Sequence, residues 1–424
     1  MSAETTPSKG ALAYLTTATC IASLSFGFNI GVVNQAADYF DKCTTEDATW
    51  NCFPVSKRAW GVMSSMMCVG ALLGSLAAGH LADTQGRLRA LNITSGVYIA
   101  GLLLFGFAIS YWMLLLGRTL VGVGVGLACV IVPMYLNEAS PVRWRGTVVF
   151  GHQLAIVTGI VLVEALALVF GVSDGNWRWI VLLNLSLQVI QLILLLGCKE
   201  SSSWHSHRTR RITNDSETVD TIIPSKPEQS YTERLFSKEA RRSLFVAVFL
   251  HFAQQVSGIN GIFFFSASLF PASPYVPVLI ALLNLIMSFI SMSLIEKLGR
   301  RPLLLGSLTG MVISSLSLYI STNSTFSALM ILCFVATFAA GLGPVPWVAM
   351  SELFPSSTVG TFLPLAVSTN WIMNMIVAAV FLPLHNYLGN DGLFLLMGLI
   401  CTALLVVSFL FVQETKGRPA GYLN

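Results

Sequence analysis

Charged residues are scarce in this chain: only 10% of its 424 residues are Asp, Glu, Lys or Arg, against about 25% in an ordinary soluble domain. So few charges could not cover the surface of a water-soluble fold of this length. Apolar residues make up 54% of the sequence, and they occur in long runs that lipid can solvate. The composition therefore argues against a soluble protein and favours an all-α integral membrane protein.

Several signatures of chemistry are also missing. The eight cysteines and six histidines form no cluster with metal-ligand spacing, and no phosphate-binding loop or nucleophile–base arrangement occurs. We therefore expect no enzyme activity, no cofactor and no metal. Most cysteines lie inside apolar runs, where they act as small hydrophobic residues. Cys43 and Cys52 lie in a polar loop instead, and their spacing leaves a disulfide between them open.

The apolar runs predict about twelve membrane-spanning helices. A span needs about 20 apolar residues to cross a ~30 Å hydrocarbon layer, and only structures that satisfy their own backbone groups can do so. The segment at 12–33 has no small-residue cleavage site, so we expect a retained span rather than a signal peptide. The expected spans are 12–33, 59–82, 90–109, 112–136, 148–170, 178–198, 243–270, 275–298, 302–320, 326–350, 359–382 and 391–412.

A polar, basic segment at 199–242 divides these spans into two sets of six. We expect an N-terminal half at 1–198, a cytoplasmic linker at 199–242, a C-terminal half at 243–412 and a cytoplasmic tail at 413–424. Two motifs recur at matching places in the halves: Asp83-x-x-Gly86-Arg87 with Glu296-x-x-Gly299-Arg300-Arg301, and Glu138-x-x-Pro141 with Glu352-x-x-Pro355. Such repetition indicates an internally duplicated transporter.

Basic residues predict the orientation of the chain in its membrane. With both termini in the cytoplasm, nineteen of the 24 Lys and Arg residues fall in cytoplasmic segments, as the positive-inside rule requires. The net charge of +4 then reflects topology and says nothing about nucleic acid. The partner we expect is the lipid bilayer, and we expect no nucleic acid. Protein partners stay unknown.

The motifs along the chain resemble those of one family. The chain carries FGFNIGVVN from Phe26, GRTLVGVGVG followed by PMYLNEASP and RG from Gly117, HQLAIVTGI from His152, QQVSGINGIFFFS from Gln254, GPVPWVAMSELFP from Gly343 and ETKGR from Glu414. Together they are similar to the sugar porters of the major facilitator superfamily, and among these to the facilitative glucose (hexose) transporters. The resemblance implies two six-helix halves that expose a sugar to alternate faces of a plasma membrane or an internal, vacuole-like membrane.

Uncharged amides inside apolar spans suggest where a ligand binds. An amide in hydrocarbon is costly unless it is paired, so these side chains should face the bundle interior. Contacts between helices would explain a single one, and that alternative stays open. The adjacent pair Gln254 and Gln255 points about 100° apart on a helix, which one such contact cannot explain. Several converging amides would offer donors and acceptors to a small neutral sugar or polyol.

Two tryptophans complete this expected site. Aromatic faces pack against the C–H groups of sugars, and Trp347 follows a Gly-Pro-Val-Pro segment that should break its span. The resemblance likewise places substrate contacts at Gln153, Gln254, Gln255, Asn260, Asn284, Trp347, Asn370 and Trp371.

A residue of the first span bears on how transport is coupled. Proton symporters of the family usually have an Asp where this chain has Asn29, and an amide cannot exchange a proton. Facilitative uniport is therefore favoured, with a proton-coupled symporter as the alternative. Glu164 is a possible proton site within the fifth span, unless it lies near the outer end in solvent, the position we favour slightly. His152 and His251 are further titratable candidates, each more simply explained as a satisfied interior histidine.

The charged motifs have a gating role by resemblance. They would form salt bridges that close the cytoplasmic side, at Glu138, Arg145, Glu296, Arg300, Arg301 and Glu352. The alternative is that these charges only set topology. Val359 and Leu88 stand where the family usually has Arg, and Lys199-Glu200-Ser201-Ser202-Ser203 replaces its Pro-Glu-Ser-Pro-Arg motif. These departures leave open a non-transporting sugar sensor or regulator.

Overall fold

The structure is a computed structural model, and it describes residues 9–41, 54–141, 143–170, 176–201, 204, 238–263, 275–321, 323–354 and 359–417. Cys43 and Cys52 lie outside these residues, as do most of the expected linker and the end of the expected tail.

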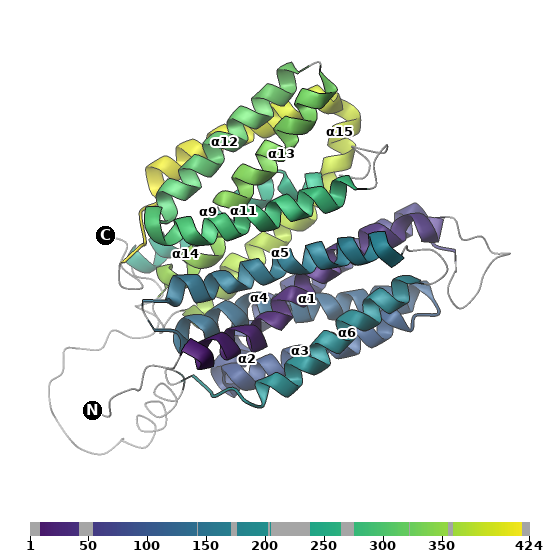
Figure 1. The fold of residues 1–424 in the computed structure, drawn as a ribbon, viewed down its shortest axis with the longest axis vertical. Helices are drawn as coiled ribbons and strands as arrows, with labels where there is room; N and C mark the ends of the chain where they lie inside the picture. The colour runs from purple at the N-terminus through teal and green to yellow at the C-terminus, as the bar shows by residue number, and fades with distance from the viewer. Residues whose placement is uncertain are drawn as a thin grey trace.

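Helices make up nearly all of the described chain (Figure 1). Their bounds are α1 Lys9–Asp41, α2 Lys57–Gln85, α3 Arg87–Gly106, α4 Tyr111–Ala139, α5 Arg145–Phe170, α6 Asn176–Leu195, α9 Lys238–Val256, α11 Val276–Leu298, α12 Arg300–Ile320, α13 Ser324–Ala340, α14 Val345–Leu353 and α15 Val359–Phe411. Within the described residues, twelve helical segments are long and apolar enough to cross a membrane. The expected all-α class and the expected number of spans are confirmed.

Several of these spans do not match single helices. The tenth span runs from Thr325 to Met350 and contains α13, a break at 341–344 and most of α14. Pro344 and Pro346 frame the start of α14, where a fixed φ suits a helix N-terminus and a missing N–H does no harm. The eleventh and twelfth spans are joined in α15 across a kink at Gly389, whose φ is 66°.

Packing gathers the helices into two groups. Helix α2 packs against α4 and α1 against α5, whereas α12 packs against α13 and α15. Figure 1 shows α1–α6 as one bundle and α9–α15 as a second bundle beside it. The groups meet mainly where α2 contacts α15 and where α5 contacts α11.

Small residues explain the closest helix pair, α2 and α4. A Cβ on Gly70 or Gly74 of α2 would overlap the backbone of α4, and a Cβ on Gly122 or Gly126 of α4 would overlap the backbone of α2. Small-residue contacts of this kind let helices associate in lipid, where burial of apolar surface between helices gives little driving force.

Candidate functional site

A cavity lies between the two helix groups, and both contribute to its wall. Of the eight side chains expected to bind substrate, seven line it: Gln153, Gln254, Gln255, Asn260, Asn284, Trp347 and Asn370. Asn374 and Glu164 line it as well. The structure therefore brings amides from α5, α9, α11 and α15 to one place, together with Asn260, which lies just beyond the end of α9.

Sequence reasoning missed the apolar part of this wall, which includes Phe26, Ile30, Ile156, Ile160, Ile259 and Phe338. A signal for some of them was present on α5. Gln153, Ile156, Val157, Ile160 and Glu164 are spaced as one helical face, and all five line the cavity.

Gln254 is held by the break between α13 and α14. Its Nε2 donates to the carbonyl oxygens of Gly343 at 2.6 Å and Leu342 at 3.3 Å. Its Oε1 accepts from Nδ2 of Asn370 at 2.7 Å. The helix break thus supplies carbonyl acceptors, and Gln254 joins α9 to this break and to α15.

Gln255 continues this chain of amides. Its Nε2 donates to Oδ1 of Asn370 at 3.0 Å, and its Oε1 accepts from Nδ2 of Asn260. Asn260 can reach it because α9 ends at Val256 and the backbone turns at Gly258, whose φ of 87° suits glycine. Four amides therefore form one connected network on the cavity wall.

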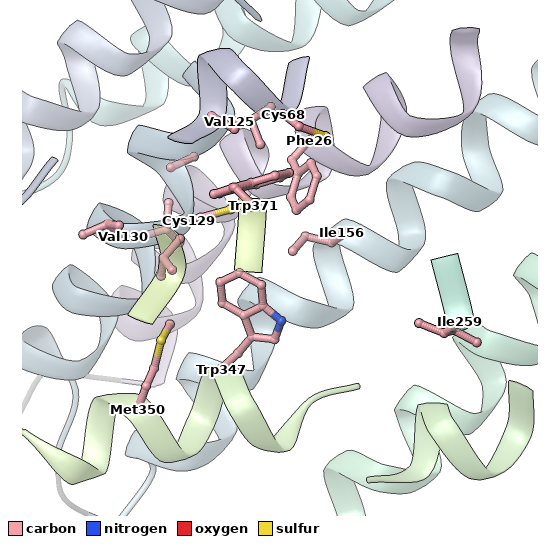
Figure 2. Close-up of a cluster of buried hydrophobic side chains, with 14 of the residues drawn as sticks. Phe26, Cys68, Val125, Cys129, Val130, Ile156, Ile259, Trp347, Met350 and Trp371 are labelled. Atoms are coloured by element: carbon pink, nitrogen blue, oxygen red, sulfur yellow. The ribbon is translucent and has the colours of Figure 1, made fainter. Parts of the chain in front are cut away.

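Each of the two tryptophans contacts an aromatic ring of the other helix group. Trp347 meets His152 of α5 edge-to-face with ring centroids 5.2 Å apart, and it meets His251 of its own group at 4.9 Å. Trp371 meets Phe26 of α1 with ring centroids 5.4 Å apart, and both side chains are drawn in Figure 2. Trp371 is 1% exposed and lies behind Phe26, which lines the cavity. Trp347 is thus part of the wall, and Trp371 supports it.

Glu164 is the one carboxylate of the described residues that line the cavity. Its side chain is only 6% exposed, and Gly31 of α1 packs close to it. The slightly favoured expectation of a solvated position at the end of the span is therefore wrong: the carboxylate belongs to the cavity wall.

A buried guanidinium lies beside Asn29. Nη2 of Arg118 donates to the carbonyl oxygen of Asn29 at 2.7 Å, and Nη1 lies 3.5 Å from its Oδ1. The Asn29 amide also donates to the carbonyl of Ser25 at 2.8 Å. Sequence reasoning identified Asn29 but not Arg118.

The charged motifs form two clusters of nearly the same geometry. In the first, Arg87 binds Glu138 through Nε at 3.1 Å and Nη2 at 2.8 Å. In the second, Arg300 binds Glu352 through Nε at 3.1 Å and Nη2 at 2.6 Å. We call the end of the bundle that holds both clusters the charged end. Sequence reasoning did not place Arg87 among the paired residues.

A second carboxylate completes each cluster. Glu200 accepts from the backbone N–H groups of Arg87 and Leu88 at 2.9 and 3.0 Å, and Glu414 accepts from those of Arg300 and Arg301 at the same distances. A carboxylate at a helix N-terminus satisfies free donors and complements the helix dipole. Gly86 and Gly299, with φ of 92° and 94°, make the sharp turns that expose these donors.

The other charged residues of the expected gate each make a different set of contacts. Glu296 pairs with Arg300 at 3.4 Å, and this pair packs over Gly146 of the other helix group. Arg301 donates to the carbonyl of Phe409 and lies over its ring. Arg145 starts α5, and its Nε is buried without a hydrogen-bond partner among the described residues. Burial raises the pKa of the Glu352 carboxyl, and the positive charge of Arg300 partly offsets this rise.

The sequence as a whole has known relatives. A family model described as "Sugar (and other) transporter" matches residues 15–422. The facilitated glucose transporter protein 1 of Caenorhabditis elegans is 31% identical, over 94% of this chain and 87% of that protein. The facilitated glucose transporter member 2 of solute carrier family 2 from Rattus norvegicus is 30% identical, over 96% and 92%.

Solved structures share the fold. The proton:xylose symporter XylE bound to 6-bromo-6-deoxy-D-glucose, a member of the major facilitator superfamily, superposes with a TM-score of 0.83 at 22% identity, over 98% of each chain. An inward-open conformation of XylE from E. coli gives 0.72 at 21% identity, over 96% of this chain and 98% of that one.

Proposed function

Because the chain belongs to the sugar transporter family of the major facilitator superfamily, we propose that it carries a neutral hexose or related polyol across a membrane by facilitative uniport. The chain is a transporter and not an enzyme, in keeping with its relatives. The observation that carries the choice of ligand is the convergence of uncharged amides and Trp347 on one cavity between the two helix groups.

The cavity wall suits a polyhydroxylated ligand. Amides supply both donors and acceptors, while Trp347 and Phe26 supply aromatic surface for C–H groups. A carrier must also release its ligand, so we expect modest affinity: a dissociation constant of about 1 mM corresponds to roughly −4 kcal/mol.

Uniport is supported by the pair Asn29 and Arg118. A carboxylate at position 29 could bind and release a proton beside this guanidinium, whereas an amide cannot. Arg118 is instead held by the Asn29 backbone carbonyl at 2.7 Å. The usual proton site of the family's symporters is thus occupied by a group that does not titrate.

A specific observation favours the alternative of proton-coupled symport. Glu164 is buried and lines the cavity, and ionisable groups inside membrane spans often serve proton relays. A non-transporting sensor is the other alternative, suggested by the altered motifs. Against it, Glu200 keeps its capping position in spite of those changes, and Glu352 keeps Arg300 as partner in spite of Val359.

Transport would proceed by rocking of the two helix groups about the cavity. In this proposal residues 1–198 and 243–412 are the moving halves, 199–242 is the linker, and the charged end faces the cytoplasm with both termini. The six expected charges Glu138, Arg145, Glu296, Arg300, Arg301 and Glu352 would hold that end closed. The membrane would be the plasma membrane or a vacuole-like one.

One experiment separates the three functions. Purified protein is reconstituted into liposomes, and uptake of labelled hexoses and polyols is followed with and without a pH gradient. Uniport predicts equilibration of sugar without accumulation under either condition. Accumulation driven by the gradient would establish symport, and sugar binding without uptake would establish a sensor.

A further inference from the structure

The direction of every hydrogen bond in the amide network follows from the helix break. The carbonyls of Leu342 and Gly343 can only accept, so Gln254 must turn its Nε2 toward them. Its Oε1 then faces Asn370, which must donate from Nδ2. One rigid backbone feature thus sets the orientation of both amides.

The same Nδ2 of Asn370 lies 3.1 Å from Nδ1 of His251. Because Asn370 donates here, Nδ1 must carry a lone pair. On the other side of the ring, Nε2 lies 3.1 Å from the sulfur of Met350, which can only accept, so Nε2 must carry the proton. Two independent neighbours therefore require the same tautomer of a neutral imidazole.

We propose that His251 is a positioning residue of the sugar site, where its Nε2–H tautomer holds Asn370 in one orientation and so fixes which cavity amides donate. The proposal rests on the transport function proposed above. With Asn370 held, its Oδ1 accepts from Gln255, and Oε1 of Gln255 accepts from Asn260. The N–H groups left for the ligand are the second N–H of Gln255 and the second N–H of Asn260, and Oδ1 of Asn260 is left as an acceptor. This part of the wall therefore offers two N–H donors to sugar oxygens, with one acceptor oxygen beside them.

A flipped Asn370 shows why a second acceptor matters. Its Oδ1 would then face Oε1 of Gln254 and Nδ1 of His251, while its NH₂ would face the NH₂ of Gln255. His251 adds a second repulsive contact to that state, because the Asn370 oxygen then meets two acceptors rather than one. His152 provides a natural comparison: it contacts the same Trp347, but its Nδ1 is bonded to Ser23 at 2.7 Å and not to the amide network.

The tautomer can be measured directly in the unmodified protein. Protein labelled with ¹⁵N-histidine is purified in detergent, and the ring nitrogens are observed by NMR. The His251 signals are assigned from the spectra of variants at the other five histidines. We expect a protonated Nε2 and an unprotonated Nδ1. A protonated Nδ1 would overturn the proposal, whatever the protein transports.

Variants test the consequence for the sugar site. His251→Phe keeps a ring against Trp347 but removes the acceptor, whereas His251→Asn can place Oδ1 close to the position of Nδ1. Loss of one hydrogen bond corresponds to a change of about two- to twelvefold. We therefore expect His251→Phe to raise KM for the transported sugar by about that factor with kcat nearly unchanged, and His251→Asn to restore it. His152→Phe is the matched control, expected to leave KM within about twofold.

The outcomes are distinguishable from failure of the proposed function. If no neutral sugar is transported, the proposed function fails, but the NMR measurement still tests which nitrogen of His251 carries the proton. If transport occurs and both His251 variants equal the unmodified protein, the positioning role is wrong. If His251→Asn is as impaired as His251→Phe, the ring acts through packing and the proposal is overturned. Should His251→Phe not fold, His251→Leu replaces it in the same comparison.

Discussion

The side-chain amide of Gln254 donates to the main-chain carbonyl of Gly343 at 2.6 Å, across the break between α13 and α14. Through this contact Gln254 stabilises the helix break. Its neighbour Gln255 does not, because among the described residues Gln255 bonds only to the side-chain amides of the cavity wall. Two adjacent residues that look equivalent in the sequence should therefore respond differently to the same substitution.

We predict that Gln255→Ala weakens sugar binding with little loss of stability, whereas Gln254→Ala weakens both. Loss of one hydrogen bond weakens binding, or lowers the free energy of unfolding, by roughly 0.5–1.5 kcal/mol. In Gln254→Ala the backbone carbonyls also lose their donor, which lowers the free energy of unfolding by about a further 1–3 kcal/mol. Sugar binding by calorimetry and Tm by thermal unfolding would measure the two effects. Gln191→Ala is the control: this buried amide bonds to Ser95 and Thr19 away from the cavity, so only Tm should fall. Unchanged binding in both cavity variants would remove the site assignment.

The two N–H groups that Gln255 and Asn260 leave for the ligand make a prediction about sugar analogues. Fluorine can accept a weak hydrogen bond but cannot donate one, so a fluorodeoxy sugar keeps the contact that Gln255 and Asn260 would make, and a deoxy sugar loses it. For the hydroxyl that faces these amides, we expect the fluorodeoxy analogue to compete within about threefold of the parent sugar and the deoxy analogue to compete about tenfold worse. A competition panel covering every hydroxyl would show this, and equal losses for both analogues at every position would contradict it.

Regular features of the fold could be predicted from sequence. Span number follows from apolar run length, and paired motifs such as Asp83–Arg87 and Glu296–Arg300 mark the duplication. Glu200 shows the limit. It lies in the segment Lys199-Glu200-Ser201-Ser202-Ser203, which departs from the family's Pro-Glu-Ser-Pro-Arg motif. It nevertheless caps α3 as Glu414 caps α12. A capping carboxylate needs only its charge and its position, so neighbouring residues can change without loss of the contact.

The sequence also did not predict which way individual side chains point. Helical spacing identifies the face that Gln153 and Glu164 share, but it does not say whether an aromatic residue lines a cavity or supports its wall. Trp347 does the first and Trp371 the second, because α14 starts at a helix break and Trp371 lies within a continuous helix behind Phe26. Such distinctions depend on tertiary packing.

Facilitative uniport predicts how the Glu164→Gln variant should behave. In a uniporter the carboxylate contributes only hydrogen bonds, so the variant should retain equilibrating transport with at most a few-fold change in KM. In a symporter the variant would lose accumulation driven by a pH gradient. Proteoliposome uptake with and without the gradient gives the answer. Gradient-driven accumulation by the unmodified protein, abolished in Glu164→Gln, would overturn uniport and identify the proton site.

Asn29→Asp tests the same argument in the opposite direction. The new carboxylate would lie beside Arg118, where it could take up a proton whenever the pair separates. We expect transport by this variant to become dependent on pH, while the unmodified protein changes little over the same range. Initial uptake rates across a pH series would measure the effect. Asn184→Asp, on α6 and outside the cavity lining, is the control for adding a buried acid; equal pH dependence in both variants would contradict a special role for position 29.

The gating proposal makes a prediction at Gly146, where the two helix groups meet at the charged end. A Cβ at this position would overlap Glu296 and Arg300, and Arg300 has little freedom to move because Glu352 holds it on the other side. Overpacking of this kind costs about 1–3 kcal/mol, and here separation of the groups at the charged end relieves it. Gly146→Ala should therefore raise the population open at that end.

The population can be measured with a cysteine introduced at Ala281, which lines the cavity, and a membrane-impermeant maleimide applied from the charged end. We expect several-fold faster labelling in Gly146→Ala. Gly306→Ala on α12 is the matched control, because a Cβ there meets no atom within 4 Å. A shift of 1.4 kcal/mol changes a population ratio about tenfold, so even the lower part of the expected cost is measurable. Equal labelling in both glycine variants would mean that the contact between Gly146 and the Glu296–Arg300 pair does not hold the charged end closed.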